Sequence, residues 1–186
     1  MRSSFRPLRH PFVFPTLRSA IAASNRRAPE HFRIVHFSVQ VDHLHLLIEA
    51  TDKHELSSGM RSLAIRIARR VNALVHRCGR VWADRWHAHT LASPRECRHA
   101  LAYVLANFRK HEPANRALVD RYSSAPYFAG FSEYSSGPMG FTALVAGAGA
   151  VVLLPRTWLL RVGWRKSGTL SVRDGPCRTG MHEASS

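Results

Sequence analysis

The sequence is poor in acidic residues and contains almost no lysine. Its 186 residues include only 12 Asp and Glu against 27 Lys and Arg, so the formal net charge is +15. Three basic residues are lysines (Lys53, Lys110 and Lys166), and the other 24 are arginines, whose planar guanidinium pairs with phosphate through two parallel hydrogen bonds. This excess favours a polyanionic partner, most often a nucleic acid, over the alternatives of a solubility charge or the arginine bias of a GC-rich genome.

Cysteine is also scarce, with three residues, Cys78, Cys97 and Cys177. They are far apart and none forms a Cys-x-x-Cys pair, which argues against a disulfide framework and against a cysteine zinc site. Residues 1–23 are basic but lack the unbroken apolar core of a signal peptide. We therefore expect a cytoplasmic protein.

Long apolar runs are missing as well. One run, residues 139–154, has 16 residues and is rich in Gly and Ala. It falls short of the roughly 20 residues that a membrane helix needs. We interpret it as a linker or packing segment and expect no membrane partner.

The charge is distributed unevenly along the chain. Residues 1–121 hold 21 of the 27 basic residues and 9 of the 12 acidic ones. The polyanion-binding part is therefore expected in the N-terminal two thirds. From composition we expect a polyanion-binding domain over residues 1–128 and a Gly-, Ser- and Pro-rich tail, disordered in part, over residues 129–186.

Hydrophobic periodicity and capping residues predict three helices. The first spans residues 17–26 with Thr16 as its cap. The second begins at Thr51 or Asp52, runs to about residue 76 and is stopped by Gly79. The third begins with Ser93 as cap, Pro94 at the first position and Glu96 three residues on, and runs to about residue 111.

Alternating apolar residues predict strands between these helices. The predicted strands are residues 32–41, 43–50 and 81–91, and residues 156–164 could add one more. The order helix-strand-strand-helix-strand-helix predicts an α+β fold, an antiparallel sheet with helices packed on one face.

Two histidines alternate with leucines in the second strand. Because residues i and i+2 of a strand point the same way, His43 and His45 share one face, and Leu44 and Leu46 share the other. Two neighbouring imidazoles on a rigid strand can bind a divalent metal if oxygen ligands complete its shell. The alternative is two solvated histidines on an exposed face.

Tyr103 and Asn107 lie four residues apart on the third helix and so share a face. A tyrosine can attack phosphorus if a cation neutralises the phosphate, and the Asn107 amide offers a further metal ligand. His99 and His111 extend the stripe as candidates for phosphate contact or proton transfer. The alternative is a half-buried core tyrosine with a polar neighbour.

Basic and aromatic residues interleave in the third strand, a pattern typical of single-stranded nucleic-acid binding. The candidates are Arg80, Trp82, Arg85, Trp86, His87 and His89. Trp82 and Trp86 could equally be core residues, and His87 with His89 forms a second His-x-His pair that competes for the metal. Arginines on one flank of the second helix, and two basic residues that follow Tyr103, are candidates for phosphate contacts. They are Arg61, Arg66, Arg69, Arg70, Arg77, Arg109 and Lys110.

Taken together, the order and spacing of these motifs resemble the single-tyrosine HUH transposases, and more closely the REP-associated tyrosine transposases. The runs that carry the resemblance are FRIVHFSV (32–39), DHLHL (42–46), WADRWH (82–87) and YVLAN (103–107). The resemblance covers roughly residues 15–128.

The resemblance implies a metal-dependent single-strand DNA endonuclease and strand transferase. It implies Mg or Mn held by His43, His45 and Asn107, and Tyr103 as the nucleophile that leaves a 5′-phosphotyrosine and a free 3′-OH. Reversal with another 3′-OH rejoins the strand. The implied substrate is single-stranded DNA, often with a hairpin, and the protein would act as a monomer or a homodimer.

The resemblance also implies a ferredoxin-like sheet, in which a strand ahead of the first helix is central. Here residues 1–14 precede that helix, and their prolines suit a central strand badly. We therefore expect the first strand to be missing or truncated, leaving an unpaired sheet edge. Two other functions stay open: a non-catalytic single-strand-binding relic of such a transposase, and a metal nuclease that activates water.

Overall fold

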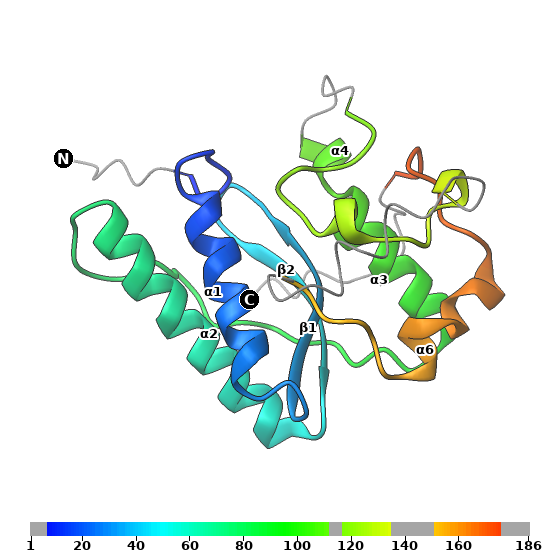
Figure 1. Ribbon diagram of the computed structural model, residues 1–186, viewed down its shortest axis with the longest axis horizontal. Helices are drawn as coiled ribbons and strands as arrows, with labels where there is room; N and C mark the ends of the chain where they lie inside the picture. The colour runs from blue at the N-terminus through cyan, green and yellow to red at the C-terminus, as the bar shows by residue number, and fades with distance from the viewer. Residues whose placement is uncertain (1–6, 112–116, 135–150, 176–186) are drawn as a thin grey trace.

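The computed structural model describes residues 7–111, 117–134 and 151–175. Its sheet has two antiparallel strands, and helices pack against it (Figure 1). The elements are α1 (Phe14–Arg27), β1 (Phe32–Val39), β2 (Leu44–Ala50), α2 (Lys53–Leu74), α3 (Pro94–Ala106), α4 (Phe108–His111) and α6 (Trp158–Arg161), with 3-10 turns at Ala125–Tyr127, Ser132–Tyr134 and Gly163–Ser167. The predicted α+β class is confirmed, and the arrangement is consistent with a truncated ferredoxin-like fold.

The helices divide between both faces of the sheet, whereas the sequence predicted one helical layer. Figure 1 shows α1 and α2 on one side of the strands and α3 and α6 on the other. The reason lies in β1, which is buried along almost its whole length. Ile34 and Phe37 pack in one core cluster with α1 and α2, and Val35 packs in a second cluster with α3. A bulge between Ile34 and His36 explains why Ile34 and Phe37, although three residues apart, pack on the same side of the sheet.

Close packing explains one glycine of α2. A Cβ atom on Gly59 would lie 2.2 Å from the ring of Phe32, a buried residue of β1. Any larger residue at this position would force the Phe32 ring or the helix to shift. Gly59 thus sets how closely α2 approaches the sheet.

The ends of the helices show which capping predictions hold. Asp52 caps α2 by accepting from the Glu55 backbone N–H at 2.8 Å, and Ser93 forms a full capping box with Glu96, both as predicted. Thr16 lies inside α1, whose N-cap is Val13 without a side-chain bond, so that prediction is wrong.

The C-terminal end of α2 also differs from the prediction. Gly79 does not stop the helix. Instead His76, three residues before Gly79, adopts the left-handed conformation (φ 50°). The Arg77 N–H donates to the Asn72 carbonyl, and this bond closes the last turn of the helix.

Two predicted strands are absent from the described residues. Residues 81–91 form an irregular segment, and residues 156–164 form the short helix α6 and the start of a 3-10 turn. A strand needs a neighbour for its backbone hydrogen bonds. In the part of the chain that the structure describes, β1 and β2 pair only with each other as a sheet, so residues 81–91 have no strand beside them.

Parts of the predicted tail supply core residues. Val152 joins the α1/α2 cluster, and Trp164 and Leu170 join the α3 cluster. The outer edge of β1 is covered by the same region, because the Leu153 N–H donates to the Ile34 carbonyl at 3.1 Å. Residues 135–150 and 176–186 of the expected tail, including Cys177, lie outside the described residues.

Both cysteines of the described residues are free thiols, the exposed Cys78 and the buried Cys97. None of the helices in the described ranges is long and apolar enough to cross a membrane.

The buried His36 gives the fold a pH dependence. Its side chain is 7% exposed, its ring packs edge-on against Phe128, and its Nδ1 lies 3.1 Å from the Ser124 hydroxyl. Burial lowers the pKa of His36 to about 4. An unfolded chain takes up a proton at this residue near pH 6.5, whereas the folded chain does so only near pH 4.

We expect His36 to contribute stability that is complete above pH 6.5 and is lost as the pH falls toward 4. The loss should amount to about 3 kcal/mol, measured by denaturant unfolding across this range. His36→Leu should flatten this part of the profile, since Ser124 keeps its bonds with the Phe37 backbone. Equal pH slopes in the two proteins would show that His36 does not titrate in this way.

Candidate active site

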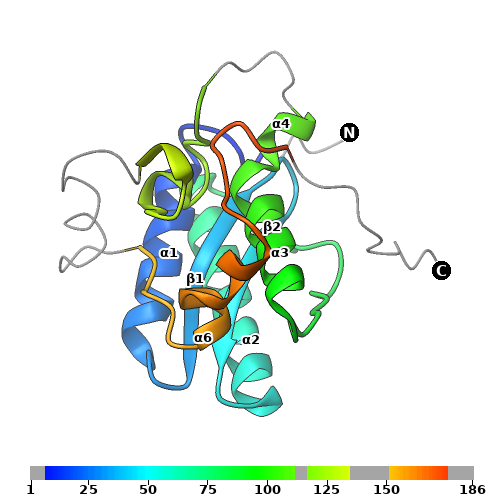
Figure 2. The ribbon, with the colours of Figure 1, turned by 90° about the vertical axis from the view of Figure 1, so that its right-hand side faces the viewer.

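Three side chains meet on the α3 face of the sheet: His43 directly precedes β2, His45 lies in β2, and Tyr103 lies in α3. The Nε2 atoms of His43 and His45 lie 3.0 Å apart, and their ring centroids are 4.6 Å apart. The ring of His45 meets the ring of Tyr103 edge-on, with centroids 4.8 Å apart. Figure 2 shows α3, which carries Tyr103, lying against β2. The structure therefore brings the predicted imidazole pair and the predicted nucleophile together.

The alternation of β2 explains why the two imidazoles share a face. Leu44 and Leu46 pack toward the α1/α2 core, so the residues between and before them point the other way. His45 stands opposite Ser38 of β1 in the register. Apolar burial on one side of the strand thus fixes the direction of the imidazoles on the other.

An acidic neighbour orients the first histidine. Asp42 Oδ1 lies 2.7 Å from His43 Nδ1. Because an ionised carboxylate only accepts hydrogen bonds, this contact places a proton on Nδ1 and leaves the Nε2 lone pair of the neutral ring directed at His45. The sequence analysis placed Asp42 in a turn and missed this contact, although a carboxylate next to a ligating histidine is a common second partner of metal sites.

Asn107 is fully buried and its side chain is unsatisfied. It ends α3 one turn after Tyr103, is 0% exposed, and neither its Oδ1 nor its Nδ2 has a hydrogen-bond partner in the described residues. An unpaired buried amide costs free energy. The structure shows no bond from Asn107 to either imidazole, so its amide oxygen is available to a ligand.

These residues fit a divalent metal with a mixed ligand set. In residues 7–111, 117–134 and 151–175, no group of three or more His, Cys, Asp or Glu could hold a metal ion. An ion at the imidazole pair would therefore need oxygen ligands from outside that set, such as the Asn107 amide or a phosphate. This donor set suits ions that accept both nitrogen and oxygen.

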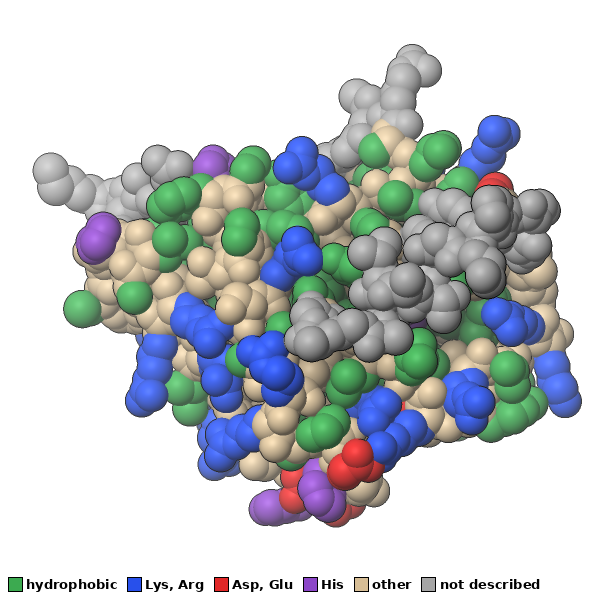
Figure 3. Space-filling view, viewed as in Figure 1, with side chains coloured by type: hydrophobic (Ala, Val, Ile, Leu, Met, Phe, Trp, Pro, Cys, Tyr) green, Lys and Arg blue, Asp and Glu red, His purple; other side chains and the backbone are tan. Residues whose placement is uncertain are grey.

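The arginines predicted on α2 lie elsewhere. This helix covers the sheet face opposite the imidazole pair, where Leu63 and Ile67 are buried. Arg61 and Arg69 are exposed, Arg66 is half-buried, and Arg70 donates to the Ser19 hydroxyl of α1. Figure 3 shows many Lys and Arg side chains on the side that α1 and α2 present. They form a basic surface apart from Tyr103.

The segment of residues 80–89 is largely open to solvent. Trp82 is the exception, because its indole N–H donates to the Ala64 carbonyl and its ring packs against the α1/α2 core, as the core interpretation predicted. Trp86 is 40% exposed. Arg80 donates to the Ala83 carbonyl, and Arg85, His87 and His89 are exposed. Because this segment is not a strand, its backbone does not direct His87 and His89 to the same side.

The remaining predicted contacts lie on α3 and α4. Arg109 donates to the carbonyls of Leu118 and Val172, so its guanidinium ties two loops together. His99 is half-buried on α3. The side chains of Lys110 and His111 lie outside the described residues.

Comparison with known families gives one match. Residues 17–107 match the family model described as "transposase IS200 like". The matched segment begins within α1 and ends at Asn107, so it contains both imidazoles and Tyr103. Comparisons with curated proteins and with solved structures found no match.

The unsatisfied amide of Asn107 predicts a stability test with a built-in control. Asn107→Leu should raise the free energy of unfolding by about 1–2 kcal/mol, because it removes a buried polar group that has no described partner. Thermal unfolding would measure this as a rise of a few degrees.

Asn25 is the matched control, since it is also buried (2% exposed) but its amide is bonded to the backbone of Ile34 and Val151. Asn25→Leu should destabilise the fold. A loss of stability in both variants would mean that Asn107 is structurally satisfied.

Proposed function

Because residues 17–107 match the IS200-like transposase family, we propose that the chain cuts and rejoins single-stranded DNA with Tyr103 as the nucleophile and a divalent metal, Mg or Mn, as cofactor. The observation that carries this proposal is the edge-on contact of Tyr103 with His45, whose Nε2 faces that of His43. A core tyrosine would need no such neighbours. The arrangement puts a phenol next to a metal-binding pair.

The metal would be held by His43, His45 and the amide oxygen of Asn107. When bound, it supplies positive charge that polarises the scissile phosphate. Asp42 keeps His43 in the tautomer whose Nε2 can bind a cation. The unsatisfied amide of Asn107 supports this role. Its oxygen has no hydrogen-bond partner in the described residues, as expected for a metal ligand when the metal is absent.

Tyr103 performs the covalent step in this scheme. Its phenolic oxygen attacks phosphorus and gives up its proton, while the bond from phosphorus to the 3′ oxygen breaks and that oxygen takes up a proton. The products are a 5′-phosphotyrosine and a free 3′-OH. Attack by another 3′-OH reverses the step and restores both the DNA strand and the tyrosine, so no nucleotide cofactor is consumed.

The exposed segment of residues 80–89 suits the binding of unpaired bases. Trp86 offers a ring for stacking, and Arg85, His87 and His89 offer contacts to phosphates. The arginines of α2 face away from Tyr103, so we assign them to phosphates distant from the cleaved one, such as those of a hairpin stem. The working form would be a monomer or a homodimer.

A second candidate is a non-catalytic relic that binds structured single strands. The small sheet favours it, because the described residues contain only two paired strands. This candidate predicts salt-sensitive binding without covalent attachment. A metal nuclease that activates water would instead cleave DNA without leaving protein on a 5′ end.

Replacement of Tyr103 by Phe should abolish covalent attachment and leave DNA binding within a few-fold, because only the attacking oxygen is removed. The measurement is a denaturing gel of labelled hairpin DNA incubated with the protein and Mn. Tyr122→Phe, at another half-buried tyrosine, is the control and should retain the adduct. An unchanged adduct in Tyr103→Phe would refute the assignment.

Removal of either imidazole should abolish metal-dependent cleavage. His43→Ala and His45→Ala are expected to lose the adduct, and Asp42→Asn should weaken Mn binding about 10- to 100-fold, measured by calorimetry. His87→Ala and His89→Ala should weaken DNA binding but keep metal-dependent cleavage when the protein is present at saturating concentration. Cleavage that survives in the first pair and fails in the second would move the metal to His87 and His89.

A further inference from the structure

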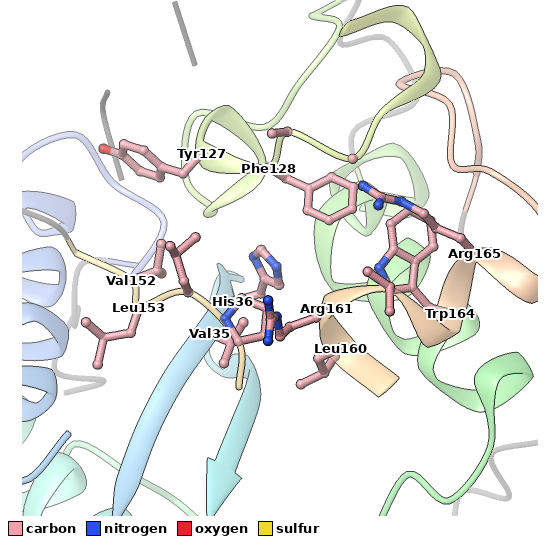
Figure 4. Close-up of a pocket in the computed structure, with 15 residues that line it drawn as sticks. Val35, His36, Tyr127, Phe128, Val152, Leu153, Leu160, Arg161, Trp164 and Arg165 are labelled. Atoms are coloured by element: carbon pink, nitrogen blue, oxygen red, sulfur yellow. The ribbon is translucent and has the colours of Figure 1, made fainter. Parts of the chain in front are cut away.

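The part of the chain beyond the family match builds a pocket on the α3 face of the sheet. The pocket has a volume of about 460 Å³ and is lined by residues of β1, of the loop 127–130 and of the segment 152–165. Figure 4 shows His36, Phe128, Trp164 and Arg161 gathered around this space. Most of these lining residues follow Asn107, so the family match does not account for the pocket.

The wall of the pocket is aromatic. The rings of His36 and Phe128 meet edge-on at 5.3 Å, and Phe128 and Trp164 lie 5.7 Å apart between centroids. Gly130 keeps this wall open, because a Cβ atom there would lie 2.5 Å from the Phe128 ring and 2.9 Å from that of Trp164. A flat, apolar ligand would find matching surfaces on such a wall.

One uncharged polar group faces this apolar space. The Ser124 hydroxyl donates to the Phe37 carbonyl, so its oxygen accepts from His36 and the proton of that ring sits on Nδ1. The Nε2 atom of His36 is left as an acceptor and makes no hydrogen bond in the described residues. Burial keeps the ring neutral at pH 7, since its pKa is lowered to about 4. A ligand that donates an N–H would match this acceptor.

Two arginine side chains lie at the exposed side of the pocket. Arg161 and Arg165 line it and are exposed, and neither guanidinium has a hydrogen bond or ion pair within the described residues. Residues 151–172 contain four basic side chains and no acidic one. Nearby, the ammonium of Lys166 lies 5.1 Å from the ring of Trp158, which is 51% exposed. Arginine beside aromatic rings is the composition that holds single-stranded nucleic acid.

The pocket and the imidazole pair share one face of the sheet. His36 stands opposite Leu47 in the register, and His45 lies two residues before Leu47 on the same face. Two residues of a strand span about 7 Å. A strand of DNA held at the imidazole pair could therefore reach the pocket with a base only a few nucleotides away.

We propose that this pocket binds one unpaired nucleobase of the DNA strand, with Arg161 and Arg165 on the adjoining phosphates. The base would stack against the aromatic wall and donate an N–H to His36 Nε2. The inference rests on the proposed function, because it takes single-stranded DNA as the ligand. It adds a base-reading site that the family match does not contain.

The test is a scan of binding with single abasic sites. A hairpin oligonucleotide with a single-stranded flank is prepared as a series, each member lacking one base, and binding to the full chain is measured by fluorescence anisotropy. We expect loss of one base in the flank to weaken binding about 5- to 100-fold. Ala129→Trp places a bulky ring at an exposed position that lines the pocket. It should weaken binding of the intact oligonucleotide by the same factor.

In Ala129→Trp the same abasic site should cause no further loss, because the pocket is already blocked. Gly175→Trp is the matched control: Gly175 is exposed, a Cβ atom there meets nothing within 4 Å, and the residue does not line the pocket. Arg161→Gln and Arg165→Gln should reduce the salt dependence of binding, whereas the exposed Arg173→Gln should not.

The outcomes separate this inference from the proposed function. An abasic profile that is the same in the native protein and in Ala129→Trp overturns the pocket assignment, even if Tyr103 still forms its adduct. Additive losses from the abasic site and Ala129→Trp overturn it as well, because the base would then lie elsewhere. If the abasic site weakens binding to the native protein but not to Ala129→Trp, the pocket assignment is supported, even when the protein does not cleave DNA.

Discussion

The structure depends on the antiparallel pairing of β1 with β2 and on the strict alternation of β2. Leu44 and Leu46 enter the core under α1 and α2, and this burial turns His45 to the opposite face. A slip of one residue in the register would bury the imidazoles and expose the leucines. The position of the imidazoles relative to Tyr103 is thus set by hydrophobic burial on the far side of the sheet.

The sequence alone predicted the elements that depend on local patterns, namely strand alternation and helix capping. Alternation identified both strands of the sheet, and the Ser93-Pro94-x-Glu96 signature placed the start of α3 at the right residue. Strand and helix periodicities predicted that His43 and His45 share one face and that Tyr103 and Asn107 share another. The meeting of Tyr103 with the imidazole pair was implied by the resemblance to the single-tyrosine transposases. Their role in catalysis stays a proposal.

Predictions failed where long-range contacts decide the structure. Residues 81–91 have the alternation of a strand, yet a strand requires a partner, which no local pattern reveals. The end of α2 depended on His76 taking a conformation that usually favours glycine. Composition suggested a tail after residue 128, but a few apolar residues such as Trp164 and Leu170 suffice to bind it to the core. The contact of Asp42 with His43 joins neighbouring residues, and the sequence could have indicated it.

The residues beyond the family match are best understood as completing a small sheet. β1 would otherwise expose its outer backbone edge, which in isolation invites pairing with other chains. Here the Ser124 N–H donates to the Phe37 carbonyl and the Leu153 N–H to the Ile34 carbonyl, so two distant segments cover that edge. Covering it brings the segments 124–130 and 151–165 over the α3 face, where their side chains enclose the aromatic pocket. One packing requirement, the protection of β1, therefore accounts for both the covered outer edge and the pocket that we propose as a binding surface.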